Sequence, residues 1–108
     1  MMHEYMLTVG LFDKDTKKQM VETNAAKAIL DNILIKKYGM FAYTMMDCQG
    51  VYTMDSDGSL VHEPSIRIEL VVDECINDTI RAIVNDIKTE LNQESVMVKH
   101  TEADIDFI

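Results

Sequence analysis

The 108-residue chain has only two cysteines, one proline, four glycines and no tryptophan. The two cysteines, Cys48 and Cys75, allow at most one disulfide, which excludes a fold built on a disulfide framework. The low proline and glycine content excludes collagen-like and low-complexity chains. A hydrophobic core must therefore hold the fold together, and a hydrophobic content of 47% suits one domain of this length. We expect residues 1–108 to form a single domain.

Long apolar runs and an excess of basic charge are also missing. No run approaches the roughly 20 residues that cross a bilayer, and the first residues lack the basic and apolar stretches of a signal peptide. We therefore predict a cytoplasmic protein without a membrane partner. Ten basic against nineteen acidic residues give a net charge of −9. Because like charges repel, this balance opposes direct binding of nucleic acid.

The negative charge is concentrated in the second part of the chain. Residues 1–38 carry six basic and five acidic side chains, whereas residues 39–108 carry four basic and fourteen acidic ones. Such an imbalance either keeps the protein in solution or attracts a basic partner. We predict that seven acidic residues contact a basic protein surface: Asp47, Asp55, Asp57, Glu63, Asp73, Glu74 and Asp78.

Hydrophobic periodicity predicts an alternation of strands and helices. Apolar residues at every second position predict strands over 4–11, 65–73 and 94–100. A short segment rich in aromatic, Met and Thr residues predicts another strand over 40–48, and Asp and Gly at 55–58 predict the turn of a hairpin over 50–62. A spacing of three and four residues predicts helices from Thr23 or Asn24 to about Tyr38, and from Asn77 or Asp78 to about Asn92. Residues 101–108 form an acidic and apolar tail, which is either solvated or packed on the body or a neighbouring subunit.

This order of elements predicts an α+β fold. Right-handed crossovers turn two strand–helix–strand units into a ferredoxin-like two-layer sandwich, with a four-stranded antiparallel sheet, two helices on one face and an extra hairpin. The alternative is a mixed sheet in which residues 50–62 add full strands.

Motifs for a cofactor, a metal or a nucleophile are absent. An EF-hand alignment on Gly58 puts Thr53 and Pro64 at the first and twelfth ligand positions, where carboxylates are needed. The histidines, His3, His62 and His100, lack the spacing of a zinc motif. Acidic neighbours disfavour an activated thiolate at Cys75. No glycine-rich phosphate loop or catalytic serine motif is present, so we predict no cofactor, no metal and no catalytic residue.

The strand alternation leaves one sheet face without helices. A mixed apolar and polar face of this kind suits a contact between copies of the chain, and we predict a homodimer. The predicted interface residues are Met6, Thr8, Arg67, Glu69, Val71, Met97 and Lys99.

Four segments carry a resemblance to a known family. They are residues 9–19 (VGLFDKDTKKQ), residues 50–58 with GVYTM and Asp57-Gly58, residues 63–70 (EPSIRIEL) and residues 91–96 (LNQESV). Together they resemble a family of small uncharacterised proteins of bacterial genomes, plasmids and phages. The resemblance implies a ferredoxin-like fold and a mobile-element origin, and it transfers no catalytic residue.

These observations favour a non-enzymatic binding or regulatory module that acts through protein–protein contacts. The mobile-element resemblance extends this to inhibition of a nucleic-acid-handling host protein, in which the acidic residues take the place of phosphates. The alternative is a small-molecule-binding or enzymatic ferredoxin-like domain with a pocket beside the hairpin of residues 50–62.

Overall fold

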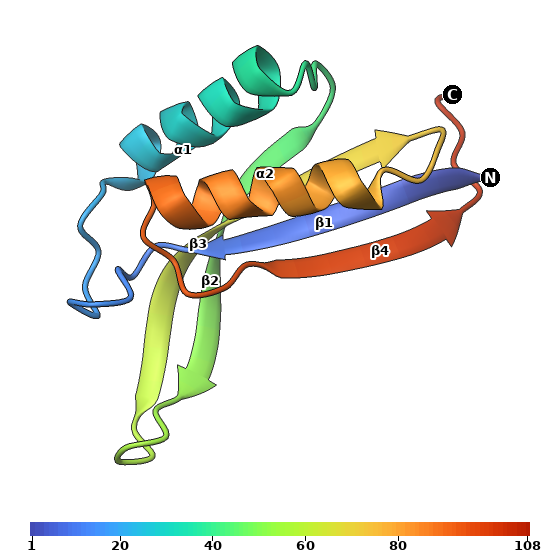
Figure 1. Cartoon of the computed structure of the whole chain (residues 1–108). Coiled ribbons are helices and arrows are strands. Elements are labelled where there is room, and N and C mark those ends of the chain that lie inside the picture. The colour runs from blue at the N-terminus through green and yellow to red at the C-terminus, as the bar shows by residue number, and fades with distance from the viewer.

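The computed structural model describes all of residues 1–108 and contains one antiparallel sheet with the strand order β2-β3-β1-β4. Both helices lie over the same face of this sheet (Figure 1). The predicted ferredoxin-like α+β fold is therefore confirmed. Along the chain the elements are β1 (Met2–Gly10), α1 (Thr23–Asp31), the π-helical segment η1 (Asn32–Lys37), β2 (Thr44–Thr53), β3 (Leu60–Val72), α2 (Asn77–Glu90) and β4 (Met97–Ala103).

The core lies between the helices and the inner face of β1 and β3. Strand geometry turns alternate side chains to opposite faces, so every second residue of these two strands meets the helices. The alternation predicted from the sequence is seen here, since Leu7 and Ile68 are fully buried. The other large core side chains are Tyr5, Val9, Ile66 and Leu70 from the sheet, and Leu30, Leu34, Ile83 and Ile87 from the helical layer.

The first helical segment ends next to Tyr38, where the sequence predicts its end, and a glycine follows. Gly39 has φ +66°, a left-handed conformation that glycine adopts without steric cost. Its backbone N–H donates to the carbonyl of Ile35, 3.1 Å away, which satisfies a carbonyl at the helix end. The chain therefore leaves the helical layer here and enters β2, which begins at Thr44 rather than at the predicted Met40.

β2 and β3 extend beyond the rest of the sheet. Pairing of β3 with β1 stops at Ser65, whereas its pairing with β2 continues to Thr53 and Leu60. The paired ends form a hairpin that leaves the body of the molecule (Figure 1). The hairpin over residues 50–62 is thus an extension of two core strands, and the alternative of additional strands in a mixed sheet is wrong.

The C-terminal strand is displaced toward the C-terminus, since β4 covers Met97–Ala103 where the sequence predicts residues 94–100. β4 continues through residues 101–103, so only residues 104–108 lie outside regular structure, and Phe107 among them is exposed. No helix of the structure has both the length and the apolar composition needed to span a membrane.

Candidate functional site

A half-buried carboxylate lies where β3 leaves the body of the sheet. Glu63 pairs with Gly50 of β2 and, by the strand alternation, faces away from the helices. The backbone N–H of Phe12 donates a hydrogen bond to its Oε2 atom, with an N···O distance of 2.7 Å. Bonds from a backbone N–H to a charged carboxylate are short and strong. This bond therefore fixes the Glu63 side chain across the end of β1.

The Glu63 carboxylate occupies the space that a side chain at position 10 would fill. A Cβ atom on Gly10 would lie 2.4 Å from Oε2 and 2.7 Å from Oε1 of Glu63. Both distances are shorter than any ordinary van der Waals contact, so a side chain here would displace the carboxylate. The position of Glu63 therefore depends on a glycine at the end of β1.

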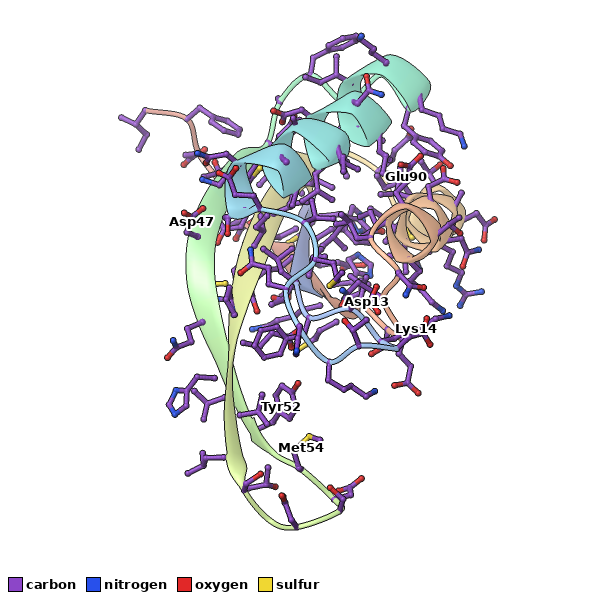
Figure 2. All side chains as sticks on the ribbon, turned by 90° about the vertical axis from the view of Figure 1, so that its left-hand side faces the viewer. Asp13, Lys14, Asp47, Tyr52, Met54 and Glu90 are labelled. Carbon is purple, nitrogen blue, oxygen red and sulfur yellow. The ribbon has the colours of Figure 1, made fainter.

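Tyr52 belongs to the same helix-free face, two residues along β2 from Gly50. Partial burial and the nearby negative charge of Glu63 both raise the pKa of the Tyr52 phenol above its ordinary value. The phenol therefore keeps its proton at neutral pH and can donate a hydrogen bond. Tyr52 is 43% exposed, and Figure 2 shows its ring on the same side of the hairpin as Asp13 and Lys14.

Two loops support this end of the sheet. The loop after β1 is tied to β3 by the N–H of Leu11, which donates to the Pro64 carbonyl at 3.0 Å. It is tied to the loop after α2 by the buried Gln93, whose Nε2 donates to the Phe12 carbonyl at 3.0 Å. Because Phe12 also holds Glu63, the α2–β4 loop indirectly positions the carboxylate.

Asn92 makes the second tie between these loops. Its Nδ2 donates to Asp13 Oδ1 at 2.8 Å and to Asp15 Oδ2 at 2.9 Å. The bond from Asn92, together with N–H groups of the loop, lowers the pKa of Asp13, which keeps its carboxyl ionised. A pocket of about 150 Å³ opens beside this tie, and no hairpin residue lines it; its lining is Leu11, Asp13, Met20, Val21, Glu90, Leu91, Asn92 and Gln93.

The seven acidic residues predicted to form one partner surface are not brought together. Asp55 and Asp57 lie at the tip of the hairpin, whereas Asp73, Glu74 and Asp78 lie at the opposite end of β3, in a molecule 45 Å long. Of the other two, Asp47 forms an ion pair with Lys27 of α1, and Glu63 is the half-buried carboxylate described above. The strands separate these charges because the hairpin extends β3 away from the body.

The predicted interface residues do share one face. The sheet register places Met6 beside Glu69 and Lys99, and Thr8 beside Arg67 and Met97. Val71 follows Glu69 by two residues on β3 and therefore lies on the same face. Arg67 Nε donates to Thr8 Oγ1 at 3.4 Å. Glu63 and Tyr52 continue this face toward the hairpin, so the candidate site and the predicted interface are adjacent.

Metal-binding geometry with three or more ligands does not occur. No group of three His, Cys, Asp or Glu side chains converges as metal ligands. At the hairpin tip, the Asp57 carboxylate accepts bonds from the backbone N–H and the hydroxyl of Ser59, at 2.9 and 2.6 Å. These bonds are those of a turn, as expected from the sequence.

Comparisons with known proteins identify solved structures of the same fold. No protein-family model and no curated protein sequence matches the chain. A phage SAM lyase in complex with S-methyl-5'-thioadenosine is similar with a TM-score of 0.69 and 24% identity, covering 94% of this chain and 81% of that one. The apo form of a phage SAM lyase gives a TM-score of 0.60 with 23% identity, over 92% and 78% of the two chains. The ATP complex of GlnK from B. subtilis gives 0.58 with 16% identity, over 93% and 81%.

These likenesses correct the function expected from the sequence. The expectation was a non-enzymatic module acting through protein–protein contacts, yet two of the three structures are of an enzyme. The comparisons favour the alternative, a small-molecule-binding or enzymatic ferredoxin-like domain. Sequence reasoning named Glu63 only as surface charge, and it missed Gly10, Phe12 and Tyr52. Their meeting depends on the strand register and on the length of the hairpin, for which no local motif exists.

Proposed function

We propose that the protein binds S-adenosylmethionine and acts as a lyase that releases S-methyl-5'-thioadenosine. The observation that carries the proposal is the likeness, over 94% of the chain, to a phage SAM lyase holding S-methyl-5'-thioadenosine. Four sequence segments resemble a family found in phages and plasmids, which agrees with a likeness to a phage protein.

Charge favours a sulfonium substrate over a nucleoside triphosphate such as the ATP bound to GlnK. S-adenosylmethionine carries a positive sulfur and a positive ammonium group, whereas ATP is a polyanion. The candidate site holds a fixed carboxylate, Glu63, and the chain has a net charge of −9. In a half-buried site of lowered dielectric constant, a carboxylate attracts a cation more strongly than it does in water. We assign to Glu63 the role of binding a positive group of the substrate.

Tyr52 supplies a hydrogen-bond donor on the same face. Its raised pKa keeps the phenol protonated at neutral pH, so it can donate to a carboxylate or ring nitrogen of the substrate. The two residues together orient a ligand with both cationic and accepting groups. Holding reacting groups in one geometry accelerates an intramolecular step.

The reaction needs no external reactant. The bond from sulfur to the γ-carbon of the methionine part breaks, and its electron pair stays on sulfur, which turns the sulfonium into the neutral thioether of S-methyl-5'-thioadenosine. The carboxylate of the same substrate forms a bond to the γ-carbon and closes a five-membered lactone. The ammonium group is unchanged, so charge and atoms balance without water or a cofactor.

Incubation of the purified chain with S-adenosylmethionine tests this proposal. We expect S-methyl-5'-thioadenosine to accumulate, as measured by liquid chromatography with mass detection. Glu63→Gln should lower the rate by about 10²-fold, which is of the order lost when one preorganised electrostatic group is removed from an active site. Glu74→Gln, at the opposite end of β3, is the matched control and should keep the rate of the parent.

Two outcomes would contradict the proposal. Calorimetric binding of S-adenosylmethionine without release of S-methyl-5'-thioadenosine would leave a ligand-binding domain and reject the lyase activity. The absence of both binding and turnover would reject both parts of the proposal.

We also propose that a second copy of the chain covers the helix-free face. Met6 of β1 lies there diagonally across from Met97 of β4; Met6 is half-buried and Met97 is 59% exposed. Methionines at such positions suit a protein contact, because the flexible side chain adapts to its partner. Glu63 and Tyr52 lie on the same face, so a second copy would also enclose the candidate site.

A further inference from the structure

Two histidines meet at the end of the sheet remote from Glu63. His3 lies near the start of β1 and His100 in the middle of β4, 97 residues away in sequence. The Nδ1 atom of His3 and the Nε2 atom of His100 are 2.9 Å apart. We propose that this pair is a binding site for a divalent transition-metal ion, in which both imidazoles coordinate one ion.

The distance between the two nitrogen atoms fits two adjacent ligands of one ion. Imidazole nitrogens bind first-row metal ions at about 2.0–2.1 Å. Two such bonds at a right angle separate the nitrogens by about 2.9 Å, and at a tetrahedral angle by about 3.3 Å. The observed 2.9 Å is a hydrogen-bond distance that lies within reach of this range, so one ion can bind both nitrogens once the rings turn; right angles between ligands are typical of the square-planar and tetragonal sites of Cu²⁺ and Ni²⁺.

A buried tyrosine holds one of the ligands in place. The ring of Tyr5 stacks on that of His100 with centroids 4.3 Å apart and an angle of 3° between the planes. Tyr5 is 1% exposed, and its hydroxyl donates to Asn77 Oδ1 at 2.7 Å and accepts from the N–H of Ile76 at 3.0 Å. The His100 ring therefore rests on a fixed support, which lowers the entropy lost when a metal ion binds.

The same two nitrogens now share one proton, which a metal ion would replace. Because only one of them can be the donor, the other presents a lone pair to it. His3, near the end of β1, is only half-buried, whereas Tyr5 is fully buried, so the His3 ring has room to turn until both lone pairs point at one ion. Glu102, the partner of His3 in the β1–β4 register, adds a negative charge to the same face.

The site is of a two-ligand type. No third His, Cys, Asp or Glu side chain converges with the pair, so water fills the remaining coordination positions. Neither histidine belongs to the candidate site at Glu63, and the inference is independent of the proposed lyase activity.

Titration of the full chain with Ni²⁺ alone, followed by calorimetry in slightly alkaline buffer, tests the inference. We expect one ion to bind per chain. Replacing either ligand by glutamine, in His3→Gln or His100→Gln, should weaken binding by about tenfold or more. The third histidine of the chain, His62 on the hairpin, provides the matched control, and His62→Gln should leave the affinity unchanged.

Electron paramagnetic resonance with Cu²⁺ on the unaltered chain gives a readout that does not depend on the folding of a variant. Splitting from two coordinated imidazole nitrogens is expected. A spectrum with one coordinated imidazole, or Ni²⁺ affinity that His100→Gln leaves intact, would overturn the shared site. Equal weakening in all three variants would mean scattered binding to separate histidines and would overturn it as well.

Discussion

The two faces of the same sheet differ in composition and in what they do for the molecule. On the helix side, β1 and β3 present aliphatic side chains such as Leu7 and Ile68, which are fully buried. On the other side, the neighbouring residues Thr8, Arg67 and Glu69 are polar and only partly buried. Successive residues of one strand therefore have different roles. The helix side stabilises the fold, and the helix-free side carries the candidate site and the proposed contact with a second copy.

The largest expected effect is a difference in stability between substitutions at two adjacent residues of β3, one on each face of the sheet. Ile68→Ala removes buried methyl groups and leaves a cavity in the core, which should lower the free energy of unfolding by about 2–5 kcal/mol. Glu69→Ala, one residue along the strand, should change it by no more than about 0.5 kcal/mol. Chemical denaturation of both variants measures the difference. Similar losses in the two would show that the helix-free face also contributes a packed core.

The core could be predicted from the sequence because a buried face leaves a periodic pattern. The alternation over 65–73 predicts that Ile66, Ile68 and Leu70 face the core, and the helical spacing predicts the same of Leu30 and Ile83; these five residues are buried. Each of these elements turns one face to the common core, so the spacing of apolar residues within the element is enough to predict which residues are buried.

The course of β2 and β3 was predicted less well. The sequence predicts a hairpin over residues 50–62 that is separate from the strands over 40–48 and 65–73, yet Gly50 and Pro64 lie within the continuous strands β2 and β3. Proline is tolerated at position 64 because it lies just beyond Ser65, the last residue of β3 that pairs with β1; its carbonyl still accepts a bond from Leu11, and the missing N–H costs no bond of the β1–β3 ladder. Neither the length of the hairpin nor the meeting of Tyr52 with Glu63 is encoded in a local pattern.

The second prediction concerns the glycine below the Glu63 carboxylate. Gly10→Ala should displace the carboxylate, because the new methyl group would lie 2.4 Å from Oε2. The colliding atoms are the end of a flexible side chain, so stability should fall by less than about 1 kcal/mol. The rate of S-methyl-5'-thioadenosine release should fall about tenfold or more, because a small misplacement of a site group is enough to slow catalysis.

Gly50→Ala is the matched control for this variant. A methyl group there would meet Ser65 Oγ at 3.5 Å, an ordinary contact, and Glu63 only through its backbone. We expect its activity and its melting temperature to remain close to those of the parent. Equal activity in the two glycine variants would argue against a role of the Gly10 contact in placing Glu63.

The third prediction addresses the proposed contact between copies. The double variant Met6→Glu/Met97→Glu places two new charges on the helix-free face and leaves the helix-side core unchanged. Unpaired charges are disfavoured inside an interface, so self-association should weaken while the melting temperature of the isolated chain changes little. Sedimentation velocity at micromolar concentration measures the assembly. A monomer in the parent protein would refute the contact, and an unchanged assembly in the double variant would place it elsewhere.

The smallest expected effect lies within the helical layer that covers the other face. The hydroxyl of Tyr38 donates to Asp86 of α2 at 2.5 Å, and the Lys37 ammonium forms an ion pair with the same carboxylate at 2.9 Å. The bond from Tyr38, and then that from Lys37, lowers the pKa of Asp86. Because the folded state favours the charged form, the resulting stability is present above the ordinary carboxyl pKa and is lost as pH falls through the lowered value.

Asp86→Asn should therefore lower the melting temperature slightly at neutral pH, and the gap to the parent should close as the solution is made acidic. Thermal denaturation of both proteins over a pH series measures this. Glu94→Gln, which removes an exposed carboxyl in the loop after α2, is the control and should follow the parent at every pH. A gap that stayed constant into the acid range would mean that Asp86 acts through packing rather than through its charge, since only a charged partner loses its contribution on protonation.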